Sequence, residues 1–379
     1  MKKDFVMLAG GDTILGANPE YYFKSIDPVL KSGDLVLTQL EVPYSDDAPE
    51  LEDLDRERKN LEPLLSRFDL VTMAGNHIYD AGEKGVRDTL EWLDEKGMPH
   101  VGGGMNLEEA KKPLIMEKDG IRFGFLNYNC VGGAPQFAGK DKAGSAPLEI
   151  ITHYDLEQVA NPGGPPEKIY TFPKWSALEE MAGQIKKLKA ECDIVSVYFH
   201  KGLVHKPVKL ADYERVVSYA AIESGADVVF GGHSHIMHGI EVYKGKTIYH
   251  GLCNLIAWVP SLGPHWKRKS GKATAVFDPE AWARTRMERF GFVPLMDYPT
   301  YPFHPESIYS LIAKCVIRDK KIVETRFIPM IVNKEGVPEV VSRESGGQEV
   351  LDYMIKITKG AGLNGTFEWD GDEVVISGS

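Results

Sequence analysis

The sequence predicts an α/β fold built around a largely parallel sheet. Short runs rich in β-branched and aromatic residues alternate with amphipathic stretches over the first two thirds of the 379 residues, which is the pattern of βαβ units. Hydrophobic residues make up 43% and charged residues 26% of the chain, as is typical of a globular protein with ample core. Glycines directly after apolar runs mark where strands end.

The expected strands are short and lie at 5–9, 35–40, 69–74, 122–128, 193–199 and 227–230. Residues 82–97 predict a helix, because Val86, Leu90 and Leu93 follow helical spacing and Gly97 is a C-cap signal. Hairpins are expected at 235–252 and 310–332. The tail adds a helix at 347–362 and a hairpin at 365–377 with Asp-Gly at its turn.

Two insertions interrupt this pattern and are expected to build the substrate pocket. Residues 129–172 are rich in glycine and proline, which predicts a long loop or a series of turns. Residues 257–306 are dense in aromatic residues, prolines and histidines, and the prolines of 299–307 predict a stiff, extended loop that is neither helix nor central strand. We therefore expect a main domain over 1–340 and a C-terminal helix and hairpin extension over 341–379.

Charge and cysteine content exclude several classes of protein. With 44 basic and 55 acidic residues the formal net charge is −11, which disfavours a nucleic-acid partner. The four cysteines are scattered without a CxxC pair, so no disulfide framework is expected. The apolar stretch near the N-terminus is too short for a signal peptide, and no run reaches about eighteen apolar residues. We expect a cytoplasmic protein with no membrane partner.

Histidines crowd into VVFGGHSHIMHG, residues 228–239. His233 and His235 follow a buried strand and two glycines, and thus stand at a strand's carboxyl end, where open α/β sheets place their sites. Side chains two apart in an extended segment share a face, so both imidazoles can point at one metal ion. For this motif alone, the alternative is that the histidines cap a turn or are exposed.

Polar side chains follow other strands as well. They are Asp12 after the first strand, Glu41 after the second, Asn76, His77 and Asp80 after the third, and His200 before the final HxH. Five parallel strands would thus deliver metal-binding groups to one sheet edge, which predicts a two-metal site with a bridging carboxylate. Taken singly, each residue has another explanation, such as a helix cap, a surface acid or a strand-end histidine.

Five segments in order, GGD, LE, GNHIYDAG, FHKG and GGHSHIMHGIEVYKGKTIYHGLCN, carry a resemblance over about residues 4–256 and 305–335. They resemble the CapA-type poly-gamma-glutamate capsule biosynthesis family, a branch of the calcineurin-like metallophosphoesterase superfamily. The resemblance implies a four-layer α-β-β-α sandwich with two mixed sheets face to face. It also implies two ligand sets that share a bridging Glu41: Asp12, Glu41 and His235 for one metal, and Glu41, Asn76, His200 and His233 for the other. His77 would be the general acid, and Asp80 would orient it.

The chain departs from the phosphoesterase pattern beside the site. Asp12 is followed by Thr13 and Ile14 where that pattern has DxH, so one metal loses an imidazole. One or two divalent ions are expected, with manganese, magnesium or calcium favoured over zinc or iron because nitrogen ligands are fewer. The resembled branch usually has tryptophan at the position of Lys201 and an SLGNF-like segment in place of GLCNL.

Three functions remain open from the sequence. The first is a metal-dependent hydrolase that acts on an amide or peptide bond, gamma-glutamyl-like, or on a phosphoester, in a small-molecule or peptide substrate. The second is a metal-dependent peptide epimerase, which needs a second base besides His77, drawn from His205, His238, His250, His265 and His304. The third is a non-catalytic component of capsule or polymer assembly. The residues expected to bind substrate are Lys201, His205, His250, Asn254, His265, Arg268, Tyr301 and His304.

Overall fold

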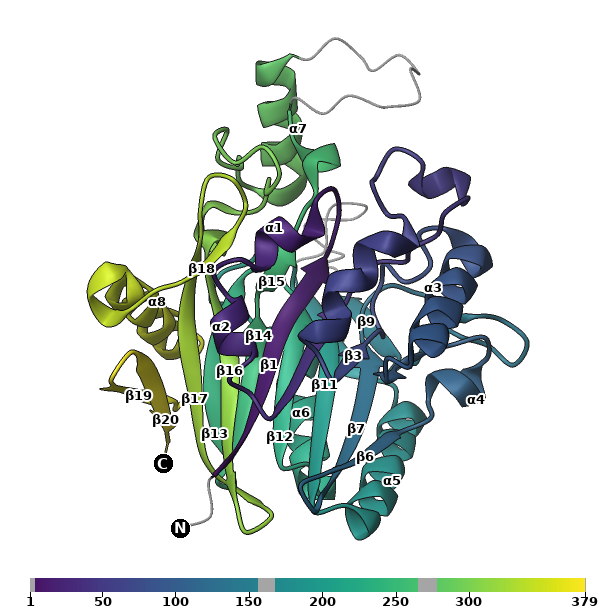
Figure 1. The fold of residues 1–379 in the computed structure, drawn as a ribbon, viewed down its shortest axis with the longest axis vertical. Helices are drawn as coiled ribbons and strands as arrows, with labels where there is room; N and C mark the ends of the chain where they lie inside the picture. The colour runs from purple at the N-terminus through teal and green to yellow at the C-terminus, as the bar shows by residue number, and fades with distance from the viewer. Residues whose placement is uncertain (1–3, 156–167, 265–277, 379) are drawn as a thin grey trace.

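The computed structural model describes residues 4–155, 168–264 and 278–378. Two sheets pack face to face, with helices on the outer face of each, as Figure 1 shows. The predicted four-layer α-β-β-α sandwich is therefore confirmed.

The larger sheet contains ten of the described strands in the order β19-β20-β17-β16-β1-β2-β3-β4, with β15 beside β1 and β18 beside β17. Its first four strands along the chain run parallel to one another, whereas β16 and β17 join as antiparallel strands. The strands are β1 (Phe5–Ile14), β2 (Leu35–Leu40), β3 (Leu70–Thr72), β4 (His100–Val101), β15 (Asn254–Ala257), β16 (Tyr309–Arg318), β17 (Lys321–Val332), β18 (Pro338–Val340), β19 (Thr366–Asp370) and β20 (Glu373–Ser377).

The smaller sheet has the order β13-β14-β12-β11-β7-β6. Its middle strands are parallel, and an antiparallel strand closes each edge. The strands are β6 (Leu114–Lys118), β7 (Ile121–Asn129), β11 (Ile194–Lys201), β12 (Val228–His233), β13 (Met237–Tyr243) and β14 (Lys246–Leu252). Two further pairs lie outside both sheets: β5 (Gly103–Gly104) with β8 (Gly144–Ser145), and β9 (Ile150–Asp155) with β10 (Lys168–Pro173).

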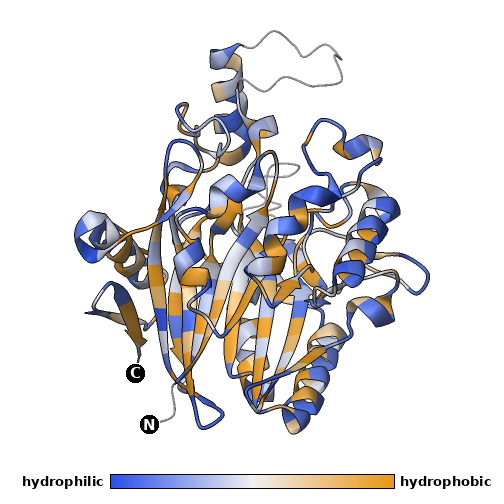
Figure 2. Ribbon diagram, viewed as in Figure 1, coloured by the Kyte–Doolittle hydropathy of each residue, from blue (hydrophilic) through white to orange (hydrophobic). Residues whose placement is uncertain are grey.

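Three apolar layers hold the sandwich together. The layer between the sheets contains Phe5 and Leu37 from one sheet and Phe125 and Phe230 from the other. The outer layers lie between each sheet and its helices, and Figure 2 shows apolar residues along the strands of both sheets. The helices are α1 (Pro19–Phe23), α2 (Asp27–Leu30), α3 (Gly82–Lys96), α4 (Leu107–Ala110), α5 (Trp175–Glu191), α6 (Asp212–Ser224), α7 (Pro279–Phe290) and α8 (Gly347–Gly360). Burial of this apolar surface is the main force that holds the layers together.

Both insertions contain more regular structure than the sequence predicted. The antiparallel pair β9–β10 lies within 129–173, and α7 lies within 257–306, where the side chain of Asp278 accepts the backbone N–H groups of residues 280 and 281. A 3₁₀ turn, η4 (Pro305–Ile308), ends the proline-rich segment 299–307. The expectation of no helical structure there is wrong for these residues, because proline is well tolerated in the first turn of a helix.

The C-terminal elements form at the predicted places and join the sandwich. Strand β20 pairs with β17, and Val350, Met354 and Ile357 of α8 belong to the apolar layer between the sheets. The division into domains at residue 340 stays a prediction. Within the described ranges, no helix combines the length and the apolar character needed to cross a bilayer.

Candidate metal centre

The candidate ligands converge from both sheets. Strands β1, β2 and β3, which carry or precede Asp12, Glu41 and Asn76, belong to the larger sheet, whereas β11 and β12 belong to the smaller one. The expectation of a single sheet edge is therefore wrong, because the ligands meet where two facing sheets end. Asp12 also lies inside β1 and not beyond it, at an irregularity in the pairing with β2 and β15.

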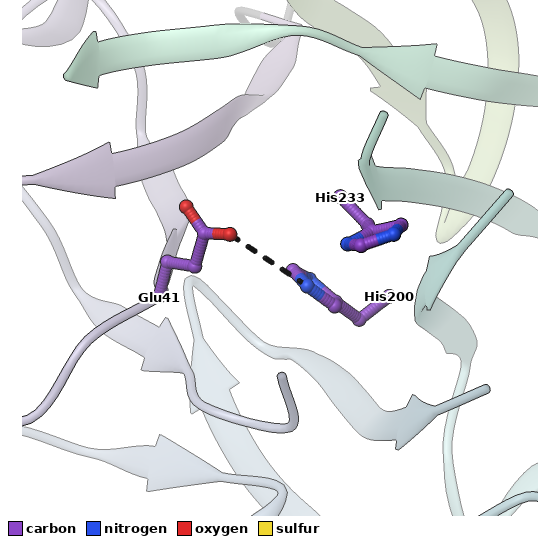
Figure 3. Close-up of side chains that lie close together, drawn as sticks. All are labelled: Glu41, His200 and His233. Carbon is purple, nitrogen blue, oxygen red and sulfur yellow. Dashed lines mark ion pairs between the residues drawn. The ribbon is translucent and has the colours of Figure 1, made fainter. Parts of the chain in front are cut away.

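Glu41, His200 and His233 form the first ligand group (Figure 3). One potential ligand atom from each of these residues lies within 4.8 Å of the others, and His200 Nε2 is 3.8 Å from Glu41 Oε1. Asn76 joins them, since its Oδ1 is 2.8 Å from His200 Nε2 and 3.1 Å from His233 Nδ1. The structure thus brings together all four residues expected at one metal.

Asp12, Glu41 and His235 form the second group, in which one potential ligand atom from each residue also lies within 4.8 Å of the others. His235 Nε2 lies 3.3 Å from Glu41 Oε1, and His235 Nδ1 lies 3.9 Å from Asp12 Oδ2. Glu41 belongs to both groups, in the position expected of a bridging carboxylate.

The carboxylate oxygens fit a cation site. The side chains of Asp12 and Glu41 are completely buried, yet Asp12 Oδ1 and both carboxylate oxygens of Glu41 accept no hydrogen bond from the described residues. Burying ionised carboxylate oxygens that accept no hydrogen bond is costly. A divalent ion would satisfy these oxygens, so the donor set fits the metal that the sequence implies.

The pKa values of these groups reflect their crowding. Burial and the charge of Glu41 raise the pKa of Asp12 well above its usual value. Burial also acts to raise the pKa of Glu41, but the neighbouring His235 outweighs it and holds that pKa below its ordinary range. Conversely, burial acts to lower the pKa of His235, but Glu41 and Asp12 raise it to about 9. Negative charge therefore dominates around His235, where a bound cation would replace the proton.

The backbone at the HxH motif differs from the predicted extended conformation. His233 has φ 85° and His235 has φ 50°, both in the left-handed region that non-glycine residues seldom adopt. The two imidazoles still face one region, with ring centroids 6.2 Å apart, but the alternation of an extended segment is not the reason. Such strain persists where surrounding contacts impose it, commonly at functional sites.

Gly232 allows the close approach of β12 to Asp12. A Cβ atom at this position would lie 2.6 Å from Asp12 Oδ1. The next residue, His233, donates its backbone N–H to Asp12 Oδ2 at 2.7 Å. The glycine that precedes the HxH motif thus lets β12 of the smaller sheet lie directly against Asp12 of the larger sheet.

His77 and Asp80 form a pair beside the ligand groups. His77 Nδ1 is 2.8 Å from Asp80 Oδ2, and the His77 side chain is 41% exposed. Burial acts to lower the pKa of His77, but the hydrogen bond to Asp80 and the charge of Glu41 more than offset it, so the pKa is raised. An imidazole with this pairing keeps Nε2 for another partner, as a proton donor would.

A family profile described as Bacterial capsule synthesis protein PGA_cap matches residues 4–258, which include every candidate ligand described above. The chain belongs to this family. Among curated relatives, "Capsule biosynthesis protein CapA" of Bacillus anthracis is 24% identical over 245 residues, and "PGA biosynthesis protein CapA" of Bacillus subtilis (strain 168) is 26% identical over 242 residues. Each alignment covers 62% of this chain, and 54% and 56% of the respective relative, so the chain spans about half the length of these proteins. The family resemblance inferred from the motifs is confirmed.

Solved structures with some likeness to the chain include a phosphatase from Mycoplasma pneumoniae and the calcineurin-like phosphoesterase YfkN from Bacillus subtilis. The first has a TM-score of 0.48 at 13% identity and covers 87% of this chain and 95% of that one. The second has a TM-score of 0.41 at 12% identity and covers 93% and 98%. At these TM-scores neither likeness adds to the architecture seen in the chain's own sheets.

Two residues that were expected to bind substrate in this PGA_cap member form a separate buried network. Lys201 Nζ lies 3.1 Å from Glu214 Oε2 and 3.0 Å from His250 Nδ1, and His250 Nε2 lies 3.0 Å from Glu241 Oε2. Lys201 and His250 are both completely buried. The expectation that they bind substrate is wrong, because their polar atoms are enclosed and already paired.

Asn254 and Tyr301 lie at the site but are also buried. Asn254 Oδ1 is 2.8 Å from His235 Nδ1, and Asn254 Nδ2 donates to Tyr301 Oη at 2.8 Å. Their polar groups therefore support His235 and do not face a substrate, which corrects the predicted role. Ser307, which the sequence analysis missed, donates its hydroxyl to the backbone carbonyl of His235. No local signal could have found it, since the two residues are 72 positions apart.

Aromatic rings from the second insertion surround His205. Its ring centroid is 5.7 Å from that of His235, 5.0 Å from Phe292 and 5.7 Å from Phe303, and burial lowers its pKa to about 2. His304 packs on Phe292 and accepts the backbone N–H of residue 306 through Nδ1. That ring nitrogen caps the 3₁₀ turn, and His304 is absent from both ligand groups found among the described residues. His265 and Arg268 lie outside the described residues.

Proposed function

We propose that this chain is a divalent-metal-dependent hydrolase. The observation that carries the proposal is the position of Glu41, completely buried, in both ligand groups, with two carboxylate oxygens that accept no hydrogen bond from the described chain. A carboxylate in that position would bridge two cations and offset their mutual repulsion.

Two cations held by these ligands would supply Lewis acidity and a water of lowered pKa. Asp12, Glu41 and His235 would hold one, and Glu41, Asn76, His200 and His233 the other. The first set contains a single imidazole, which favours manganese, magnesium or calcium over zinc or iron. His77, held by Asp80, would give a proton to the leaving group.

We propose an amide bond, gamma-glutamyl in type, in a peptide or small-molecule substrate, with a phosphoester as the alternative. Support for the amide comes from the relatives named for capsule and PGA biosynthesis. A peptide epimerase is less well supported, because it needs a second base across the substrate from His77. Of the five candidate bases, His238 and His250 are completely buried, burial lowers the pKa of His205 to about 2, and His304 uses Nδ1 to cap a 3₁₀ turn, while His265 lies outside the described residues. The buried, unsatisfied carboxylates also argue against a purely structural role in polymer assembly.

Metal analysis and a substrate panel test the proposal. The purified chain would be stripped with chelator and reloaded with Mn²⁺, and then offered gamma-glutamyl peptides and phosphoesters in ¹⁸O-labelled water. We expect metal-dependent cleavage with one ¹⁸O in the product, and loss of both bound metal and turnover in Glu41→Gln. In a parallel reaction in D₂O, solvent deuterium at an α-carbon without cleavage would support epimerisation instead. Wild-type protein that binds no divalent metal would refute the proposed function.

A further inference from the structure

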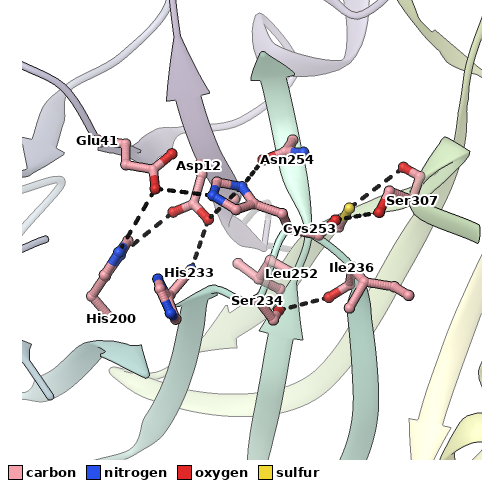
Figure 4. Close-up of polar contacts among 12 residues, drawn as sticks. Asp12, Glu41, His200, His233, Ser234, Ile236, Leu252, Cys253, Asn254 and Ser307 are labelled. Atoms are coloured by element: carbon pink, nitrogen blue, oxygen red, sulfur yellow. Dashed lines mark hydrogen bonds and ion pairs between the residues drawn. The ribbon is translucent and has the colours of Figure 1, made fainter. Parts of the chain in front are cut away.

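A chain of hydrogen bonds connects His235 to the end of the second insertion. His235 Nδ1 lies 2.8 Å from Asn254 Oδ1, Asn254 Nδ2 donates to Tyr301 Oη at 2.8 Å, and Tyr301 Oη donates to the backbone carbonyl of Ser307 at 2.8 Å. Figure 4 shows Asn254 on the side of the cluster where Asp12 lies, and Ser307 beyond Cys253. His235, Asn254, Tyr301 and Ser307 are all buried.

The direction of every hydrogen bond in this series follows from the last one, in which the acceptor is the backbone carbonyl of Ser307. A backbone carbonyl can only accept, so the Tyr301 hydroxyl must donate its proton to Ser307. The Tyr301 oxygen is then free to accept, and the group of Asn254 that faces it must be the NH₂. The Asn254 oxygen therefore faces His235, and the hydrogen of the neutral imidazole must be on Nδ1.

We propose that Tyr301 and Asn254 are positioning residues that hold His235 as the Nδ1–H tautomer, so that its Nε2 lone pair faces the metal position beside Glu41. His235 Nε2 is the ring nitrogen 3.3 Å from Glu41 Oε1. This inference rests on the metal centre of the proposed function and adds what fixes the tautomer and orientation of His235. Partners on the second ring nitrogen fix the tautomer and orientation of metal-binding histidines and raise their basicity.

A second contact fixes the backbone of the same residue. The Ser307 hydroxyl donates to the carbonyl oxygen of His235, whose φ of 50° is unfavourable for a residue with a side chain. The hydroxyl of Ser310 donates to the carbonyl oxygen of Asn254 at 2.5 Å and so holds the backbone of Asn254, the next residue in the hydrogen-bond series. The segment from residue 301 to residue 310 thus holds both the side chain and the main chain of His235 in place.

The test compares two buried tyrosines whose hydroxyls both donate to a backbone carbonyl, one near His235 and one elsewhere. Tyr301→Phe removes only the hydroxyl that hydrogen-bonds Asn254 and Ser307. Tyr249→Phe is the matched control, because Tyr249 is also buried and its hydroxyl donates to a backbone carbonyl, that of Arg326, at 2.7 Å. Each protein would be stripped of metal and titrated with Mn²⁺ by calorimetry, with thermal melting of the metal-free proteins to compare their stability.

We expect Tyr301→Phe to weaken Mn²⁺ affinity at one site by about 10 to 100 fold, the usual effect of losing such a partner. Tyr249→Phe should change affinity by less than about twofold, even if both variants melt at similarly lowered temperatures. Ser307→Ala, which frees the His235 carbonyl, should also weaken the same site. If Tyr301→Phe bound Mn²⁺ with wild-type affinity, the positioning role of Tyr301 would be overturned and the metal centre would stand. Wild-type protein that binds no Mn²⁺ would overturn both the positioning role and the metal centre.

NMR reads the tautomer directly. Long-range ¹H–¹⁵N correlations of ¹⁵N-histidine protein loaded with Mg²⁺ report which ring nitrogen carries hydrogen, and His235→Gln assigns the resonance. We expect the Nδ1–H pattern for His235 in wild type and in Tyr249→Phe, with a mixture or exchange broadening in Tyr301→Phe. An Nε2–H pattern in the wild type would overturn the proposal.

Discussion

Lys201 offers a sharp test of the tertiary structure, because the sequence suggested substrate binding and the structure shows a buried network. Its ammonium group contacts Glu214 at 3.1 Å and His250 at 3.0 Å. The partner Glu214 is completely buried as well and uses Oε1 to accept the backbone N–H of Ala211. Lys201→Met keeps most of the side-chain volume and removes only the charge and its hydrogen bonds.

The size of the effect follows from the geometry. At 3.1 Å and an effective dielectric constant of about 20, the attraction between Lys201 and Glu214 is about 5 kcal/mol. Removing one partner of a buried pair typically costs about 3 to 5 kcal/mol, since the other charge is left buried and unpaired. We therefore expect Lys201→Met to lose about that much free energy of unfolding. Adding Glu214→Gln should restore part of it, because the orphaned charge is removed.

Urea unfolding of metal-free protein, followed by circular dichroism, measures this difference without a contribution from bound metal. Lys31→Met is the matched control, since the Lys31 side chain is 57% exposed and pairs with Asp27 at the surface, where such pairs contribute little. The reasoning is refuted if Lys201→Met unfolds at the wild-type urea concentration. A raised KM in that variant, with unchanged stability, would return Lys201 to substrate binding.

Three further predictions concern the metal site and its surroundings. Ala substitutions of Glu41 or His233 should sharply lower the metal content measured by elemental analysis, because each removes a candidate ligand. A Glu41→Ala variant with the metal content of the wild type would exclude the bridging role of Glu41. His77→Asn should keep metal and slow turnover by roughly 100 to 10,000 fold, and loss of metal would instead make His77 a ligand. Burial lowers the pKa of His250 from 6.5 to about 4, so between these pH values the unfolded chain binds a proton that the folded chain does not, and stability falls as pH falls. His250→Gln should reduce that pH slope in urea titrations, and an unaltered slope would contradict the assignment.

Much of the candidate site was predictable because its residues occur in short motifs at strand ends. Asp12, Glu41, Asn76, His200 and the HxH pair were all found this way, and the structure brings them together. The same reasoning failed for Lys201 and His250, which also sit next to motif residues. Their side chains are enclosed by α6 and β13 through Glu214 and Glu241, and no sequence spacing reports which face of a strand is covered in this way.

The sequence by itself determined the α/β class, the family and the candidate metal ligands, because strand periodicity, glycine placement and metal-binding residue types are local properties. The tertiary structure alone decided that the ligands come from two facing sheets, that His233 and His235 adopt left-handed backbone conformations, and that Tyr301 and Ser307 support His235. These features depend on contacts between residues far apart in the chain, such as Ser307 with His235. Only the packing of complete layers brings such residues together, so the role of each side chain is set by where the fold buries it.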